Sequence, residues 1–233
     1  MHTIRNYIMA ESLEQAWELN QKGRNNIIIG GNLWLKMGRR NIINAIDLSS
    51  LGLDKIEEDE GGFRIGCMAT LHDIETHEGL NKEFQNLFKE AVRHIVGVQF
   101  RNCATIGGSI FPKLGFSDVL TAFLACDTQV ILYKKGEVPL REFIYIPTDN
   151  DILTHLYVKK DGRKTAYESF RMTETDFPTI TCAMAKTQDG FETVLGARPK
   201  HAEVVVDEVV ADAFSSEEVA DYAKRVIGKL QYG

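Results

Sequence analysis

The stretch Gln99 to Ser109, with the sequence QFRNCATIGGS, constrains the fold more than any other part of the chain. An apolar helix is predicted before it, and the adjacent Gly107 and Gly108 predict a turn. Paired glycines allow positive φ and let a backbone approach a ligand closely, because no Cβ intervenes. Thr105, Ser109 and the N–H groups of this loop would then face an anion, and phosphate suits such a nest.

A second glycine pair lies earlier in the chain and repeats this chemistry. A short buried strand is predicted at Ile27, Ile28 and Ile29, and it ends at Gly30 and Gly31. The residues that follow are Asn32, Leu33 and Trp34. Two strand-to-glycine turns could grip a pyrophosphate from two sides, whereas either one alone is more simply a tight turn. The glycine spacings of Rossmann and Walker loops do not occur in the sequence.

These motifs together resemble a known family, the FAD-binding subunits of molybdenum hydroxylases. The family includes the flavin domain of xanthine dehydrogenase and the medium subunit of carbon monoxide dehydrogenase. The resemblance rests on four segments: Gly30 to Leu33, Gln99 to Ile110, Ser117-Asp118, and Arg171 with Asp176-Phe177-Pro178. It covers most of the chain and implies a two-part FAD-binding domain of the PCMH type.

The resemblance implies a set of cofactor-binding positions and no catalytic or metal-binding residue. Asp118 matches an Asp that accepts hydrogen bonds from the cofactor's sugar hydroxyls, although a capping role at a helix start is the competing account. Ile95 stands where some relatives place an aromatic side chain against the flavin. The expected set is Ile27, Ile28, Ile29, Gly30, Gly31, Asn32, Leu33, Trp34, Ile95, Thr105, Ile106, Gly107, Gly108, Ser109 and Asp118.

The resemblance also implies partners and a direction of electron flow. Electrons would leave a substrate at a molybdopterin centre in a large subunit, cross a small 2Fe–2S iron–sulfur subunit, and reduce FAD on this chain. NAD or another carrier would be the final acceptor. Two alternatives stay open: a flavin-less assembly or scaffold subunit of the same fold, and a stand-alone flavin oxidoreductase.

Composition narrows the classes of partner. The net charge of −6 argues against a broad nucleic-acid surface. No apolar run reaches the roughly 20 residues of a membrane span, so we expect a cytoplasmic protein. The four cysteines form no CxxC pair, which argues against an iron–sulfur or zinc site built by this chain alone.

The order of predicted elements indicates an α+β fold. A β-α-β-β unit opens the chain, a helix runs from about Asn81 to Ile95, and the last third is a small antiparallel sheet with a terminal helix from about Ser216 to Leu230. The polar stretch 147–151 is the predicted domain boundary. It separates an FAD-binding domain, 1–147, from a C-terminal domain, 151–233. Subdomains of the first are expected at about 1–53 and 54–147.

Overall fold

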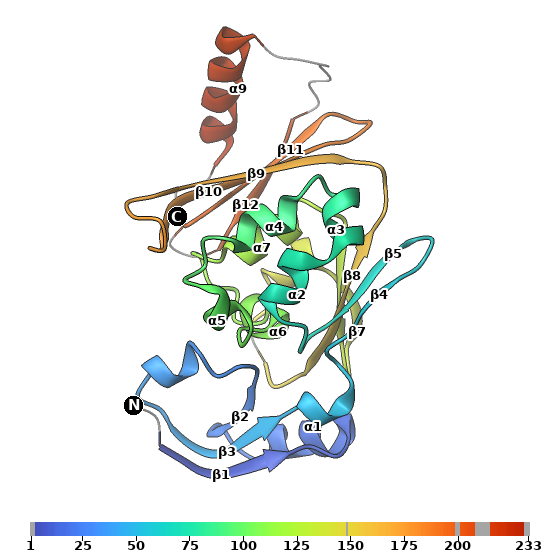
Figure 1. The fold of residues 1–233 in the computed structure, drawn as a ribbon, viewed down its shortest axis with the longest axis vertical. Helices are drawn as coiled ribbons and strands as arrows, with labels where there is room; N and C mark the ends of the chain where they lie inside the picture. The colour runs from blue at the N-terminus through green and yellow to red at the C-terminus, as the bar shows by residue number, and fades with distance from the viewer. Residues whose placement is uncertain (1–2, 148, 199–200, 208–214, 231–233) are drawn as a thin grey trace.

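The computed structural model describes residues 3–147, 149–198, 201–207 and 215–230. Figure 1 shows three layers stacked along the long axis: an N-terminal unit, a central layer of helices and sheet, and a C-terminal sheet covered by a helix. This mixed arrangement confirms the predicted α+β class. Among the described residues, no helix is both long and apolar enough to cross a membrane.

The N-terminal unit is a parallel sheet in the order β1-β3-β2, with helix α1 packed against it. Its order confirms the predicted β-α-β-β unit. Helix α1 begins after Ser12, whose hydroxyl accepts the Gln15 N–H at 3.1 Å. Among the described strands, β2 pairs only with β3, and its last residue, Ile29, directly precedes Gly30. The elements are β1 (Thr3–Met9), α1 (Leu13–Gln21), β2 (Asn26–Ile29), the 3₁₀ helix η1 (Leu35–Met37), β3 (Asn41–Asp47) and the 3₁₀ helix η2 (Ser49–Leu51).

The central layer contains an antiparallel sheet in the order β4-β5-β8-β6-β7. Strand β8 follows the predicted boundary at 147–151, of which Thr148 lies outside the described residues, and pairs with β5 and β6. The segment after the boundary therefore completes the sheet of the segment before it, and the division into two domains stays a prediction. The strands are β4 (Ile56–Glu58), β5 (Gly62–Gly66), β6 (Thr128–Leu132), β7 (Gly136–Pro139) and β8 (Leu153–Lys159).

Short helices cover this sheet, and one predicted helix is wrong. The expected helix from Asn81 to Ile95 is two helices, because Gln85 and Asn86 have φ of 47° and 63°. The break is held by strand β9, where the Thr165 N–H donates to Gln85 Oε1 at 2.6 Å. The helices are α2 (Leu71–Thr76), α3 (Glu78–Glu83), α4 (Leu87–Val92), α5 (Val98–Arg101), α6 (Ile106–Ile110), α7 (Asp118–Leu124) and α8 (Leu140–Phe143).

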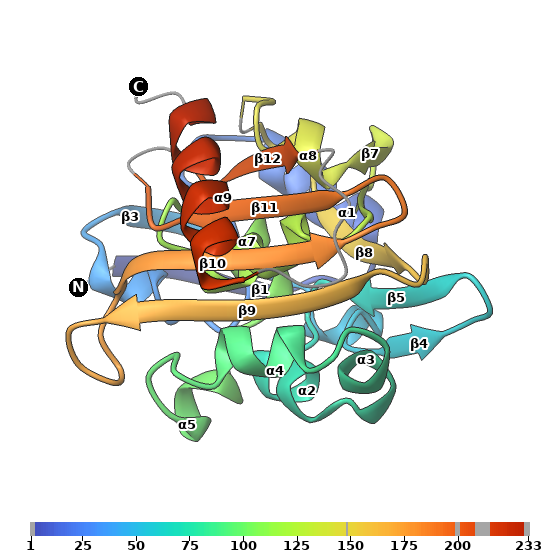
Figure 2. The same ribbon diagram turned by 90° about the horizontal axis from the view of Figure 1, so that it is seen from above.

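The C-terminal layer is an antiparallel sheet in the order β12-β11-β10-β9, with α9 lying across it in Figure 2. This confirms the predicted sheet and terminal helix. Helix α9 begins with a capping box in which Ser215 and Glu218 exchange hydrogen bonds of 2.7 and 3.3 Å. The elements are β9 (Lys164–Arg171), β10 (Pro178–Lys186), β11 (Phe191–Gly196), β12 (Glu203–Asp207) and α9 (Ser216–Lys229).

Helix α7 lies at the centre of the core and holds its first residue, Asp118, in place. Every residue from Asp118 to Leu124 is buried, and the helix contacts α4 on one side and strands β10 and β11 on another. The ring centroids of Phe88 and Phe123 lie 4.5 Å apart across the α4–α7 contact. Because interiors pack as densely as organic crystals, this helix holds Asp118 in a fixed place.

Candidate functional site

The two glycine segments predicted from the sequence pack against each other. A Cβ on Gly30 would lie 2.4 Å from Thr105 Oγ1, and a Cβ on Gly31 would lie 1.8 Å from the Cys103 carbonyl oxygen. Gly31 also has φ of +65°, a conformation that favours glycine. Both glycines are therefore required by contact with the second segment, and the two motifs form a single site.

The predicted turn at Gly107 and Gly108 is wrong, because both residues lie in the first turns of helix α6. Thr105 is the N-cap residue, and its Oγ1 accepts the Gly108 N–H at 3.2 Å. The N–H groups of Ile106, Gly107 and Ser109 donate to the carbonyls of residues 69, 67 and 105. These amides are occupied by the protein itself, so the anion nest expected in this loop is not formed by them.

The first glycine segment has the free backbone donors instead. None of the N–H groups of residues 30–34 donates a hydrogen bond to an acceptor in the described part of the chain. Asn32 has φ of +55°, and its side-chain Oδ1 is buried without a partner among the described residues. Successive unpaired amides with left-handed residues among them make a concavity that favours an anion.

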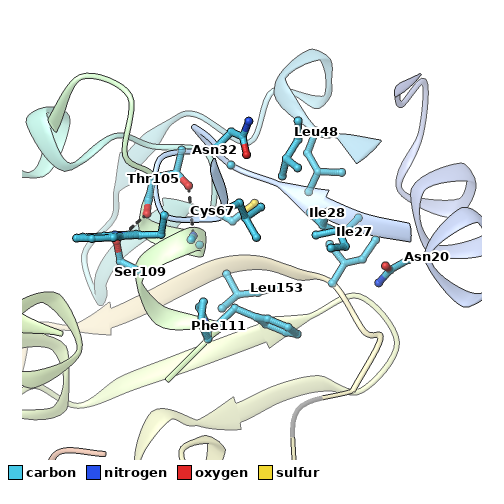
Figure 3. A pocket seen from close by; sticks show the side chains of 18 of the residues that line it. Asn20, Ile27, Ile28, Asn32, Leu48, Cys67, Thr105, Ser109, Phe111 and Leu153 are labelled. Atoms are coloured by element: carbon cyan, nitrogen blue, oxygen red, sulfur yellow. Dashed lines mark hydrogen bonds between the residues drawn. The ribbon is translucent and has the colours of Figure 1, made fainter. Parts of the chain in front are cut away.

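A first cavity of about 570 Å³ is lined by residues of both the N-terminal unit and the central layer. In Figure 3, Thr105 and Ser109 lie at one end and Ile27 and Asn20 at the other. Burial raises the pKa of the Cys67 thiol in this cavity to about 12, so the thiol stays protonated. The expected residues that line the cavity are Ile27, Ile28, Ile29, Gly30, Asn32, Leu33, Trp34, Thr105, Gly107, Gly108 and Ser109.

Two expected residues do not line either cavity. Gly31 contacts the second glycine segment, and Ile106 is fully buried in the core. The apolar side chains that complete the first cavity were not predicted from the sequence. These come from segments without a recognisable motif, namely Leu48, Phe111, Ile152 and Leu153.

A second cavity of about 290 Å³ adjoins the first, and Trp34, Ser109 and Leu114 line both. The Trp34 ring packs against Phe100, Phe116 and Phe177 with centroid distances of 5.4, 5.9 and 5.5 Å. Ile95 and Asp118, the remaining expected residues, line this second cavity. All expected residues except Gly31 and Ile106 are thus brought to two adjoining cavities.

Asp118 lines the second cavity as a buried carboxylate with two partners. Helix α7 is capped by Ser117, whose Oγ accepts the Leu120 N–H at 3.1 Å, so Asp118 is not the capping residue. Its Oδ1 accepts hydrogen bonds from the Tyr167 hydroxyl at 2.6 Å and from Arg171 Nη2. Burial raises the pKa of Asp118, and these two hydrogen bonds oppose the shift.

One polar atom of Arg171, Nε, has no hydrogen-bond partner among the described residues. Its Nη1 donates to the Asp176 carbonyl at 2.6 Å and its Nη2 pairs with Asp118, whereas the buried Nε has no acceptor among the described residues. Arg171 lines the second cavity, and 7% of its side chain is exposed. Arg171 therefore brings to the wall of the second cavity a donor that no described residue uses.

A comparison with known proteins shows which family the chain belongs to. The profile of the family described as "FAD binding domain in molybdopterin dehydrogenase" matches residues 2–158. The chain belongs to this family. The match includes both glycine segments and Asp118, and it confirms the resemblance seen in the sequence. As a member, the chain has FAD as its cofactor and is a component of an oxidoreductase.

Two relatives of this FAD-binding chain align with most of its length. The uncharacterized protein YgfM of Escherichia coli is 26% identical over 196 residues, which cover 82% of this chain and 74% of YgfM. The glyceraldehyde dehydrogenase medium chain of Sulfolobus acidocaldarius is 25% identical over 246 residues, which cover 96% and 87%. A carbon monoxide dehydrogenase from Hydrogenophaga pseudoflava has the same fold, with a TM-score of 0.85 at 23% identity over 98% of this chain and 88% of that one.

Proposed function

We propose that FAD binds across the two cavities, with its pyrophosphate at the N–H groups of residues 30–34. One observation carries the proposal: Asn32 and Arg171 line the first and the second cavity, and each has a buried polar atom, Oδ1 and Nε, without a partner among the described residues. A buried atom left unpaired costs about 1–3 kcal/mol, so a ligand that pairs it gains affinity. FAD offers both a donor for Asn32 and an acceptor for Arg171.

The residues of the site divide into those that would bind the cofactor and those that shape the loops. Hydrogen-bonding capacity that no described residue uses is found at the amides of residues 30–34, at Asn32 and at Arg171. Asp118 would accept a sugar hydroxyl through Oδ2, since Oδ1 already takes both of its side-chain partners. Thr105 would act by holding the second segment against the first, through its contact with Gly30. Bound FAD supplies the electron transfer itself.

We further propose that the chain is the electron-transfer subunit of a molybdenum hydroxylase complex. Its partners would be a small 2Fe–2S subunit and a large molybdopterin subunit, with NAD or another carrier as the final acceptor. Exposed apolar side chains that line the second cavity, or are close in sequence to residues that line it, support a protein partner there, because such clusters mark interaction sites. They are Met37, Val96, Val98, Met172 and Phe177, each 47% exposed or more.

Titration of the flavin-free chain with FAD, and in parallel with FMN, tests the cofactor proposal. In this proposal the flavin lies in the second cavity and the adenylate in the first, so FMN, which lacks the adenylate half, would leave most of the first cavity unfilled. We expect the fluorescence of both flavins to be quenched on binding. The affinity of the chain for FMN should be at least about tenfold lower than for FAD, or roughly 1.4 kcal/mol. Equal affinities would contradict binding across both cavities. The absence of any quenching would favour the flavin-less scaffold alternative.

A further inference from the structure

The segment that joins α4 to α5 forms one wall of the second cavity in a strained conformation. His94, Ile95 and Val96 line the cavity, and Val96 has φ of +53°. A β-branched residue at positive φ is an outlier, because its side chain crowds the neighbouring carbonyl. Such a conformation persists only where the surrounding structure holds it.

Arg101 is the side chain that holds this segment. Its Nη1 donates to the Ile95 carbonyl oxygen at 3.3 Å, directly before Val96. The other edge of the guanidinium forms two hydrogen bonds with Glu75, from Nε at 2.8 Å and from Nη2 at 3.0 Å. Only 7% of the Arg101 side chain is exposed, and Arg101 does not line the cavity itself.

Glu75 is in turn fixed by helix α2. The helix begins with a capping box in which Thr70 and Asp73 exchange hydrogen bonds of 2.8 and 3.1 Å. The Glu75 side chain also contacts His72 Nδ1 at 3.3 Å, one helical turn earlier. Its carboxylate is therefore a fixed acceptor, and the planar fork of an arginine meets it in a single orientation.

We infer that Arg101 is a positioning residue: paired with Glu75, it holds the Ile95 carbonyl and keeps the strained Val96 segment in place as a wall of the second cavity. The inference rests on the proposed function for its consequence, since this wall would lie beside the bound flavin. A lysine could not replace the arginine, because one ammonium group lacks the planar fork that reaches the carboxylate and the carbonyl together.

A double-mutant cycle of Arg101→Lys and Val96→Gly tests this inference. Glycine adopts φ of +53° without strain, so the segment should need Arg101 less once Val96 is replaced. In the flavin-free chain, Arg101→Lys should speed amide hydrogen exchange at Ile95 by about tenfold. In the Val96→Gly background the same substitution should change the exchange by less than about threefold.

The same cycle is then measured with FAD present. Arg101→Lys should weaken FAD by roughly tenfold and alter the fine structure of the visible flavin band, and both effects should shrink in the Val96→Gly background. Arg163→Lys is the matched control. Arg163 is also 7% exposed, pairs with Asp161 and donates to the Ala125 carbonyl at 2.5 Å, but it does not line the second cavity. It should lower stability and leave Ile95 exchange unchanged.

Two results would overturn the inference: equal effects of Arg101→Lys in both backgrounds, or faster Ile95 exchange in Arg163→Lys as well. Either would show that Arg101 acts through global stability. A wild-type chain that takes up no FAD would contradict the proposed function instead. In that case the exchange measurements on the flavin-free chain would still decide the role of Arg101.

Discussion

Gly30 packs directly against the hydroxyl of Thr105, so closely that an added Cβ would come within 2.4 Å of Oγ1. The two residues belong to different layers of the fold and to different motifs of the sequence. Their contact joins the free amides of residues 30–34 to the capped start of helix α6. The first glycine segment is therefore placed by the second one before any ligand binds.

Gly30→Ala should separate the two segments. We expect a loss of about 1–3 kcal/mol in the free energy of unfolding, the usual cost of overpacking a close contact. FAD affinity should fall as well. Gly23→Ala is the matched control, because no atom lies within 4 Å of a Cβ at that position. Denaturant unfolding and FAD titration measure both quantities, and equal FAD affinity in the two variants would contradict the joint site.

Asn32→Gly should separate ligand binding from stability. Glycine keeps the backbone at φ of +55° while removing the unpaired Oδ1. FAD should bind about tenfold more weakly, since a hydrogen bond to the ligand is lost. The flavin-free chain should be no less stable, because a buried unsatisfied atom is gone.

Asn86→Gly serves as the control for Asn32→Gly. Asn86 has a similar left-handed conformation, with φ of 63°, and lines neither cavity. Its substitution should leave the dissociation constant of FAD unchanged. An Asn32→Gly variant that binds FAD as tightly as the wild type would remove Asn32 from the binding site.

Asp118→Ala should destabilise the flavin-free chain strongly. It leaves the buried guanidinium of Arg171 without its carboxylate, at a cost of about 3–5 kcal/mol. Asp118→Asn keeps an acceptor for Tyr167 and Arg171 and should cost less. FAD affinity should fall in each of the two variants, provided that it folds. The loss should be roughly ten- to a hundredfold in Asp118→Ala, which removes the acceptor entirely.

Asp127→Ala is the control for Asp118, because its ion pair with Lys159 is exposed and contributes little. Chemical denaturation gives the stabilities and fluorescence titration gives the affinities. If Asp118→Asn lowers stability yet binds FAD like the wild type, Asp118 supports Arg171 and makes no contact with the cofactor.

Val98→Lys should weaken assembly with the proposed iron–sulfur partner and leave FAD binding unchanged. Val98 is 47% exposed at the start of α5, beside the second cavity but outside its lining. Val219→Lys on α9 is the matched control, an exposed helical valine in the C-terminal layer. Affinity purification from the native host would show the partner lost only from Val98→Lys. Retention in both variants would exclude this face as the interface.

Local sequence predicted much of this site. Strand β2, the position of Gly30 and the helix that begins at Asp118 follow from hydrophobic pattern, glycine and capping signals. These features depend on neighbours along the chain. The resemblance to a family then linked the two glycine segments, which no local rule could do. The sequence also pointed to Arg171 as a matching residue, although its unpaired Nε is visible only in the fold.

The predictions that failed depend on tertiary contacts. Gly107 lies in helix α6 with its N–H bonded to the Cys67 carbonyl, and a Cβ on Gly107 would lie 2.9 Å from Cys67. The expected helix from residue 81 to 95 is interrupted where strand β9 binds Gln85. The apolar lining of the first cavity comes from several separate segments. The contacts with Cys67 and with strand β9, and the meeting of these apolar segments, have no signal in the nearby sequence.

The cofactor content of the chain, purified from its native host, tests the central claim most directly. The protein should show a visible flavin band, and acid precipitation should release the flavin into the supernatant, as it does for a noncovalently bound cofactor. Chromatography should identify the released compound as FAD at about one molecule per chain, as expected for one continuous site. A colourless protein, or one that releases FMN, would contradict the account.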